Sequence, residues 1–314
     1  MMDEARLLEH FRQLGPASAA ESVLLPLPPG DDMALLHPPA GDLLLAVDQV
    51  VEGRHVDLRV ARLEEVAHKA VHRCLSDVAA MAGRPLAALY AATLPRSFTD
   101  DDARRLGDAL HAVSRTAGTL PAGGDVAVHA ADDGPLVLSV TVIALAHPLG
   151  SPRRSDARPG DLVCVTGVLG GTLHADGRGP HLSFEARIAE GAALRDRFGD
   201  RLGAMIDLSD GLGRDAGHLA RASGVAIEIE AARIPVRDGL DWRRGAGDGE
   251  DHELLFTLRP EVEADHLVPD EVCGTSVSVI GRVLGRSGGE LPLVVIRDED
   301  GIGHDGADFG WVHR

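Results

Sequence analysis

The stretch that decides the fold reads Gly30-Asp31-Asp32-Met33-Ala34-Leu35-Leu36 and then, after a turn, Leu43-Leu44-Leu45-Ala46-Val47-Asp48. Residues 43–47 form a short apolar run bounded by a turn, which predicts a buried strand. Asp48 is expected where this strand leaves the core, and Asp32 lies on the preceding loop. Carboxylates at a strand end suit magnesium, which prefers oxygen ligands. The alternative interpretation is purely structural, because Asp and Gly are also the commonest turn residues.

Composition bounds the class of protein. The 314 residues suit two domains of ordinary size, and a hydrophobic content of 44% is enough to fill their cores. The formal net charge of -18 argues against nucleic acid or an anionic membrane as a partner, because both attract basic surfaces. Cys74, Cys164 and Cys273 are predicted to be buried free thiols. Without a signal-like start or a membrane-length apolar stretch, we expect a cytoplasmic protein.

The first half is predicted to alternate strands and helices. The patterns indicate an amphipathic helix at 3–14, a long helix at 63–81, and strands at 86–93 and 136–146. Thr99 is the predicted N-cap of a further helix that buries Leu106, Leu110 and Val113. Residues 121–125 are predicted to form a tight turn. This order, without a dinucleotide fingerprint, favours an α/β sandwich over a Rossmann domain.

A loss of periodicity at 147–154, rich in Pro and Gly, is the best candidate for a domain boundary. We therefore predict domains over 1–148 and 149–314. The second half is expected to contain strands at 162–166, 225–230, 253–258, 275–283 and 291–296, a helix at 185–197, and a strand turning into a helix between 204 and 222. Its Gly-rich loop at 167–171 lacks the Gly-Lys-Ser/Thr ending of a P-loop.

Six aspartates stand at the end of an apolar run, in a glycine turn or in a helix: Asp32, Asp48, Asp77, Asp125, Asp207 and Asp210. Each has a structural alternative, such as a helix cap for Asp210 or a turn for Asp125. Converging carboxylates would repel one another unless several magnesium ions lay between them. ATP phosphoryl transfer uses such sites, because the metals neutralise charge on the phosphates. The pattern therefore indicates phosphoryl transfer if these residues converge.

Eight stretches, in order along nearly the whole chain, resemble thiamine-monophosphate kinase, whose superfamily includes aminoimidazole ribonucleotide synthetase and selenophosphate synthetase. The stretches are Gly-Asp-Asp-Met-Ala-Leu-Leu (30–36), Asp-Gln-Val-Val-Glu-Gly-Arg-His (48–55), Ser-Asp-Val-Ala-Ala-Met (76–81), Gly-Gly-Asp (123–125), Arg-Ser-Asp-Ala-Arg-Pro-Gly-Asp (154–161), Ile-Asp-Leu-Ser-Asp-Gly-Leu (206–212), Gly-Glu-Asp-His-Glu-Leu-Leu-Phe-Thr (249–257) and Gly-Trp-Val-His (310–313). Any one of them is a weak signal, whereas the ordered set is specific.

The resemblance implies a two-domain α/β (α+β) fold of the aminoimidazole ribonucleotide synthetase type, with an N-terminal metal- and ATP-binding domain whose sheet pairs across a homodimer. It implies the reaction of ATP with thiamine monophosphate to give ADP and thiamine diphosphate. The implied ligands of several magnesium ions are the six aspartates named above, of which Asp48, Asp125 and Asp210 would be catalytic. The implied ATP-binding residues are Gly124, Asp125, Arg154 and Ser209. The implied substrate-binding residues are His55, Glu250 and Trp311.

The chain departs from the family pattern near the metal and nucleotide side. Ala46 and Val47 stand where the family usually has a hydroxyl residue, and Val126 replaces a threonine. The Gly-Gly-Glu-Asp-Tyr form becomes Asp-Gly-Glu-Asp-His at 248–252, and an Arg-Pro-x-Pro-Arg stretch becomes Ser-Phe-Glu-Ala-Arg at 183–187.

The sequence leaves two other functions open. One is a diverged paralogue that uses ATP on a different acceptor, and the other is a non-catalytic dimer that binds nucleotide or metal. The presence of all six aspartates favours the kinase, because carboxylates held together without a function would cost stability.

Overall fold

The structure, a computed structural model, describes residues 10, 16–27, 33–260, 268–286 and 292–312. The chain divides into two compact units. The first contains residues 1–75, 84–146 and 175–178, and the second contains 76–83, 147–174 and 179–314. The predicted helix at 3–14 lies outside the described residues except for His10.

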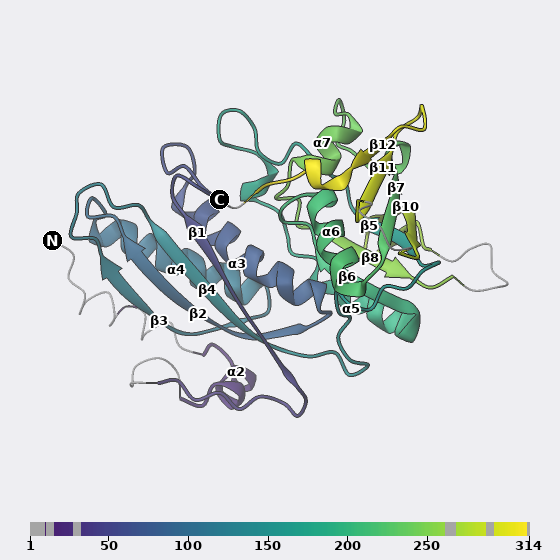
Figure 1. Ribbon diagram of the computed structural model, residues 1–314. Helices are drawn as coiled ribbons and strands as arrows, with labels where there is room; N and C mark the ends of the chain where they lie inside the picture. Colours follow the sequence, from purple (N-terminus) through teal and green to yellow (C-terminus); the bar gives the residue numbers. More distant parts are fainter. Residues whose placement is uncertain (1–9, 11–15, 28–32, 261–267, 287–291, 313–314) are drawn as a thin grey trace. The chain divides into compact units, whose positions relative to one another are not determined.

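A four-stranded sheet forms the centre of the first unit (Figure 1). Its strands are β1 (Leu43–Val51), β2 (Arg84–Leu94), β3 (Leu120–Val128) and β4 (Val137–Leu145), in the order β1-β4-β2-β3. β4 is antiparallel to both neighbours, whereas β2 and β3 are parallel. Alternation along β4 separates the two faces, because Leu138, Val140 and Val142 are fully buried and their neighbours are half-buried.

Helices α3 (Leu63–Ala80) and α4 (Asp100–Thr116) pack on the buried face of this sheet. The Thr99 hydroxyl caps α4, as the sequence predicts, and Asp102 completes a capping box with it. The hydroxyl groups of Tyr90 on β2 and Ser114 on α4 form a hydrogen bond of 2.5 Å. The segment around α2 (Ala19–Leu24), which was not predicted, packs on Ala87 and Leu120 on the other face.

The predicted turn at 121–125 is wrong, because these residues lie within strand β3. The register with β2 shifts by one residue between Pro121 and Gly123, so the glycines belong to a bulged strand instead of a turn. Gly124 is required there, since a Cβ would collide with the Tyr90 carbonyl oxygen of the neighbouring strand.

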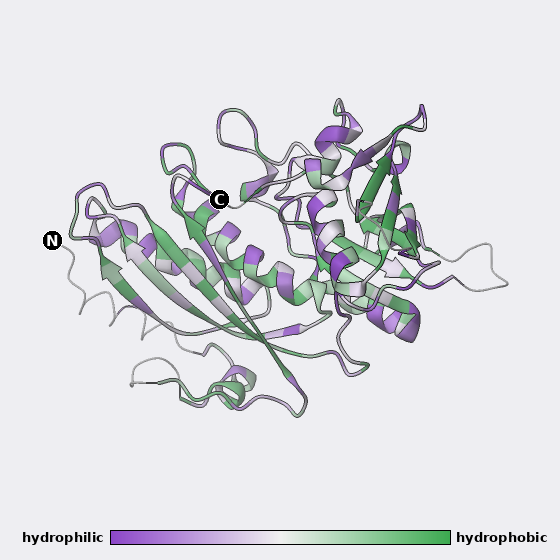
Figure 2. Ribbon diagram, in the orientation of Figure 1, coloured by the Kyte–Doolittle hydropathy of each residue, from purple (hydrophilic) through white to green (hydrophobic). Residues whose placement is uncertain are grey.

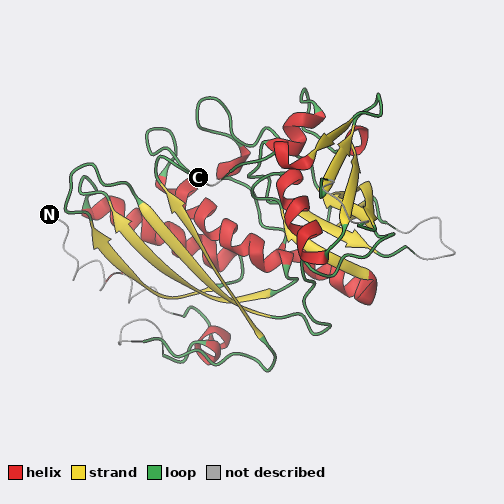
Figure 3. Cartoon of the chain, viewed as in Figure 1, coloured by secondary structure: helices red, strands yellow, loops and turns green. Residues whose placement is uncertain are grey.

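The second unit is built on an eight-stranded mixed sheet in the order β12-β11-β7-β10-β5-β8-β6, with β9 paired to β10. Its strands are among the yellow arrows in Figure 3. The strands are β5 (Leu162–Thr166), β6 (Leu202–Asp207), β7 (Ala226–Glu230), β8 (Leu254–Leu258), β9 (Glu271–Val272), β10 (Thr275–Leu284), β11 (Val294–Arg297) and β12 (Gly303–Asp305). Its longer helices are α5 (Ile188–Phe198) and α6 (Leu212–Ser223), and a short α7 spans Trp242–Gly247.

Successive residues of the central strands pack on opposite sides of this sheet. Val163 and Val165 join the core beneath α6, whereas Cys164 joins the core with Leu194 and Phe198 of α5. Burial on both faces explains why these strands are continuously apolar, as their green colour in Figure 2 shows. The strands and helices predicted for 162–166, 185–197 and 204–222 are confirmed within a few residues.

One prediction about the cysteines is wrong. Cys74 and Cys164 are buried free thiols, but Cys273 is exposed. It lies with φ +51° in the tight turn between β9 and β10, where the chain reverses and its side chain cannot enter the core. Among the described residues, no helix is both long and apolar enough to cross a membrane.

Candidate active site

Strand β6 of the second unit ends at the predicted metal ligand Asp207. This residue is 5% exposed, and the Ser76 hydroxyl donates a 2.8 Å hydrogen bond to its Oδ2. Ser76 lies in the last turns of α3, which belong to the second unit. Asp77 is the next residue of the same helix.

The loop after β6 is hydrogen-bonded to the loop before β8. Leu208 N–H donates to the Glu253 carbonyl and His252 N–H to the Leu208 carbonyl, each at 2.8 Å. Glu250 N–H donates to the Ser209 carbonyl, also at 2.8 Å. This ladder places the predicted ATP residue Ser209 against the predicted substrate residue Glu250.

The segment 249–253 holds a strained backbone. Glu250 and His252 have φ of +56° and +50°, a conformation that costs a non-glycine residue about 1 kcal/mol or more. Its carboxylates provide anchors. Asp251 Oδ1 accepts from Gly170 N–H and Arg237, and Glu253 Oε2 accepts from Thr166 and Arg187. The strain is therefore maintained by buried hydrogen bonds within the second unit.

Trp311 contacts the loops that carry Asp210 and Asp248. Its backbone N–H donates to the Asp210 carbonyl at 2.9 Å, and its indole N–H donates to the Asp248 carbonyl at 2.7 Å. The side chain is 51% exposed. The ring is therefore held by its edge with a face open to solvent, next to the loop that carries Asp210.

Asp215 supports the Asp210 loop, and the sequence analysis missed it. Gly211, the N-cap of α6, has φ +121° and no side chain to cap the helix. Asp215 Oδ2 instead accepts from the N–H groups of Asp210 and Gly211 at 3.0 and 3.1 Å. An acidic residue one turn into a helix whose N-cap is glycine could have indicated this role.

Electrostatics distinguish the two buried aspartates. Burial raises the pKa of the Asp207 carboxyl, but the nearby His252 ring, the Ser76 hydroxyl and the charge of Arg154 hold that pKa below its usual value. Burial and the charges of Asp207 and Asp210 raise the pKa of Asp215 well above its usual value. The loop therefore has a negative potential that a cation would offset.

In the first unit, Asp48 lies inside a strand. The expectation that it marks a strand end is wrong, because β1 continues to Val51. Its side chain faces α3, where Arg73 donates to both carboxylate oxygens at 2.9 and 3.3 Å. Arg73 was not predicted, although it lies at helical spacing from Ser76 and Asp77 on α3.

His55 is fixed just beyond the same strand. Its Nδ1 accepts from Val51 N–H at 3.0 Å, and its carbonyl accepts from the buried Lys69 ammonium at 2.9 Å. The Val51 contact makes Nδ1 the acceptor, so the neutral ring would carry its proton on Nε2.

The structure separates Asp48 from Asp125 within one chain. Asp48 pairs with Val140, Val140 with Tyr90, and Tyr90 with Gly124, so these four residues share one face. Asp125 follows Gly124 and therefore points to the opposite face. Three strand spacings, about 14 Å, also lie between the two positions. One first unit cannot bring both carboxylates to one ion.

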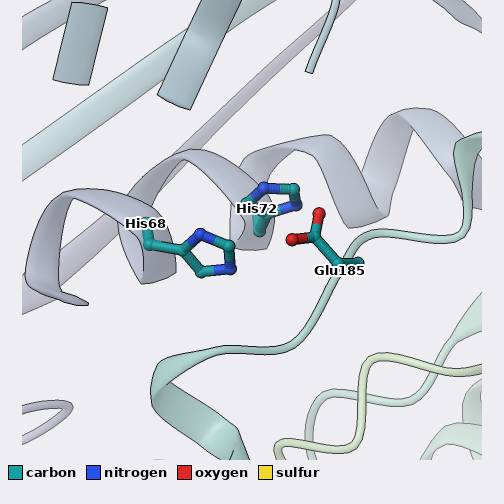
Figure 4. Close-up of side chains that lie close together, drawn as sticks. All are labelled: His68, His72 and Glu185. Carbon is teal, nitrogen blue, oxygen red and sulfur yellow. The ribbon is translucent and has the colours of Figure 1, made fainter. Parts of the chain in front are cut away.

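Two histidines stack on α3, outside the predicted acidic set. The ring centroids of His68 and His72 are 4.2 Å apart, one helical turn from each other (Figure 4). Glu185, the third residue labelled there, belongs to the second unit.

The predicted residues thus fall into two groups. The second unit brings together Asp207, Ser209, Asp210, Glu250 and Trp311, and Asp77 follows Ser76 on α3. Arg154 is exposed on a loop of the same unit, and its carbonyl oxygen accepts a hydrogen bond from the Ser223 hydroxyl. The first unit holds Asp48, His55, Gly124 and Asp125, and Asp32 lies outside the described residues. That the residues of the two groups form one active site stays a prediction.

Comparison with known proteins identifies the relationship. Residues 30–146 match the family described as AIR synthase related protein, N-terminal domain. A thiamine-monophosphate kinase of Halobacterium salinarum is 32% identical, over 90% of this chain and 94% of the relative. The Escherichia coli K12 enzyme of that name is also 32% identical, over 87% and 88%.

Solved structures of proteins with the same name are also similar to this chain. The thiamine-monophosphate kinase of Stenotrophomonas maltophilia is similar with a TM-score of 0.74 and 27% identity, over 95% of this chain and 97% of that one. AaThiL complexed with AMPPCP and TMP gives 0.70 and 27%, over 99% and 97%. The hydrogenase maturation protein HypE in complex with ATP, at 20% identity and a TM-score of 0.74, shows the fold alone.

The two sheets and these neighbours define a protein of the AIR synthase-like fold. More narrowly, the chain belongs to the thiamine-monophosphate kinase family.

Proposed function

We propose that the protein phosphorylates thiamine monophosphate with ATP to give thiamine diphosphate and ADP. The observation that carries this is the joined loop of the second unit, where Ser209, Asp210, Glu250 and Trp311 meet. Full-length relatives are named thiamine-monophosphate kinases, and one structural neighbour is complexed with both an ATP analogue and TMP. The comparisons favour this function over a different acceptor or a non-catalytic dimer.

The residues present fit divalent magnesium. Asp207 and Asp210 offer carboxylate oxygens, the ligand type that magnesium prefers, and both lie close to the further carboxylate of Asp215, whose pKa is raised first by burial and then by their charges. We assign the magnesium ions to Asp32, Asp48, Asp77, Asp125, Asp207 and Asp210. When bound, magnesium would neutralise charge on the transferring phosphoryl group.

The chain's own residues would position the reactants. Ser209 and Gly124 fit contacts to ATP, with Arg154 supplying positive charge, whereas His55 and Glu250 fit contacts to thiamine monophosphate. The open face of Trp311 suits a cationic heteroaromatic ring. Because the acceptor is already an anionic phosphate, the reaction needs alignment and charge neutralisation more than a strong base.

The proposal includes a homodimer that shares its sites. Leu43, Leu45 and Val47 of β1 are 43%, 73% and 64% exposed on the face opposite α3. Such an apolar face favours burial against a second copy. Because one first unit cannot bring Asp48 and Asp125 to one ion, the proposal takes Asp48 from one protomer and Asp125 from the other. We also propose that residues 1–148 form the domain for metal binding, ATP binding and dimerisation, and that residues 149–314 form a C-terminal domain. The proposed location is the cytoplasm.

An acceptor comparison tests the function. The purified protein is incubated with ATP, magnesium and either thiamine monophosphate or unphosphorylated thiamine, and products are separated by chromatography. Magnesium-dependent thiamine diphosphate from the monophosphate alone is expected. ATP binding with no product from thiamine monophosphate would transfer the assignment to another acceptor.

A further inference from the structure

His252 is a buried imidazole at the edge of the acidic site. It is 2% exposed, and neither ring nitrogen has a hydrogen-bond partner among the described residues. Its Nδ1 lies 3.5 Å from Asp207 Oδ2, longer than a good hydrogen bond. A buried polar group of this kind normally has a partner, which can be an ion.

The ring is held in place by two features of the backbone and packing. It stacks on Phe184, with centroids 4.0 Å apart and planes 13° from parallel. The backbone of His252 has a strained φ of +50°. The loop around it is anchored by hydrogen bonds to the side chains of Asp251 and Glu253, which fixes the position of the ring. The contact with Phe184 therefore holds the ring beside Asp207.

We propose that His252 supplies a nitrogen ligand to the divalent cation that Asp207 holds, and that it shifts the metal preference of this protein from magnesium toward manganese. This inference rests on the proposed metal site. Imidazole nitrogen favours transition metals, whereas magnesium is bound mainly by carboxylates and water. Asp207 remains available as the anionic ligand, with Ser76 fixing its orientation.

Manganese spectroscopy tests the ligand directly. The full-length protein is loaded with Mn²⁺, and pulsed electron paramagnetic resonance measures coupling to ¹⁴N. The wild-type protein should show the coupling of a directly bound imidazole. His252→Gln and His252→Tyr should lose it, and Tyr keeps an aromatic ring to stack on Phe184. His304→Gln is the matched control, because His304 is half-buried and paired with Asp298 in the same unit.

Affinity provides the second readout. His252→Tyr should weaken Mn²⁺ binding about 10-fold while changing Mg²⁺ binding much less, as expected for loss of a ligand. Bound Mn²⁺ without nitrogen coupling in the wild-type protein would overturn the inference and leave the kinase assignment intact. Failure to bind Mn²⁺ or Mg²⁺ at all would overturn both the inference and the metal site.

Discussion

The Ser76 hydroxyl donates a 2.8 Å hydrogen bond to the carboxylate of Asp207, and both residues are buried. The bond joins the end of α3 to the end of β6. It therefore fixes the orientation of a proposed magnesium ligand within the second unit.

Ser76→Ala should destabilise the fold and weaken magnesium binding. Loss of the donor leaves the Asp207 carboxylate under-satisfied, which costs about 1–3 kcal/mol of unfolding free energy. Urea denaturation and magnesium titration would measure the two effects. Ser114→Ala is the matched control, because Ser114 is also buried but bonds Tyr90 in the first unit. It should lower stability alone, and an unchanged magnesium affinity in Ser76→Ala would refute the role.

Asp215 should act by positioning Asp210. Asp215→Ala removes the acceptor of two N–H groups, so the loop should loosen and kcat should fall at saturating ATP. Asp215→Asn retains an acceptor oxygen and should recover part of the rate. Steady-state kinetics with varied magnesium would separate these outcomes. Equal losses in both variants, with no change in magnesium dependence, would assign Asp215 to stability alone.

Mixed dimers test whether sites are shared. Asp48→Asn and Asp125→Asn should each abolish turnover without unfolding the protein. If each site combines Asp48 of one protomer with Asp125 of the other, a dimer of the two variants contains one intact site. Mixing the variants under subunit exchange should therefore restore activity. Asp57→Asn, at an exposed ion pair with Arg59, should remain active throughout. If the mixture stays inactive although subunit exchange is confirmed, both residues act within one chain.

Asp251 should make stability depend on pH. Burial raises the pKa of its carboxyl from 3.8 to about 7, although the Arg237 bond opposes this change. The folded protein then holds a proton that the unfolded chain releases. Its contribution to stability is greatest at acidic pH and falls as pH rises toward the folded pKa, by up to about 1.4 kcal/mol per pH unit.

Asp251→Asn should remove this dependence. Urea unfolding at about pH 5.5 and about pH 7.5 would compare the wild type, Asp251→Asn and the exposed control Asp300→Asn. Only Asp251→Asn should show a smaller loss of stability on going to the higher pH. The same slope in all three proteins would show that Asp251 is already ionised at the lower pH.

Trp311 should determine affinity for the acceptor. Trp311→Ala removes the exposed ring and should raise KM for thiamine monophosphate about 10-fold, in line with a cation–π contact of about 1 kcal/mol or slightly more. Trp311→Phe, which loses only the bond to the Asp248 carbonyl, should have a smaller effect. KM for ATP should stay constant. Trp242→Phe, whose ring packs on Phe309, is the control. A rise confined to ATP would contradict the assignment.

Periodic apolar patterns predicted most of the fold. The long helix α3 and strands β2, β4 and β5 were found because their apolar residues recur with the period of their element. Strand β3 was missed since its Gly-Gly pair is typical of a turn, and only the neighbouring Tyr90 carbonyl shows why glycine is needed in a strand. Local sequence carries no record of such a tertiary contact.

The site was predicted in its residue types more than in its arrangement. The acidic positions stand out in the sequence, but their supporting residues do not. Arg73 contacts Asp48 across 25 positions, and Ser76 contacts Asp207 across 131. Partners so far apart cannot be paired from one sequence without homologous variation. The opposite orientations of Asp48 and Asp125 likewise became apparent only from the strand register.

The most direct test of the central claim is ³¹P nuclear magnetic resonance of the protein with ATP, magnesium and thiamine monophosphate. The account predicts that the thiamine monophosphate signal is replaced by the two coupled signals of thiamine diphosphate, with one ADP formed for each product. Release of inorganic phosphate from ATP while thiamine monophosphate remains unchanged would contradict it.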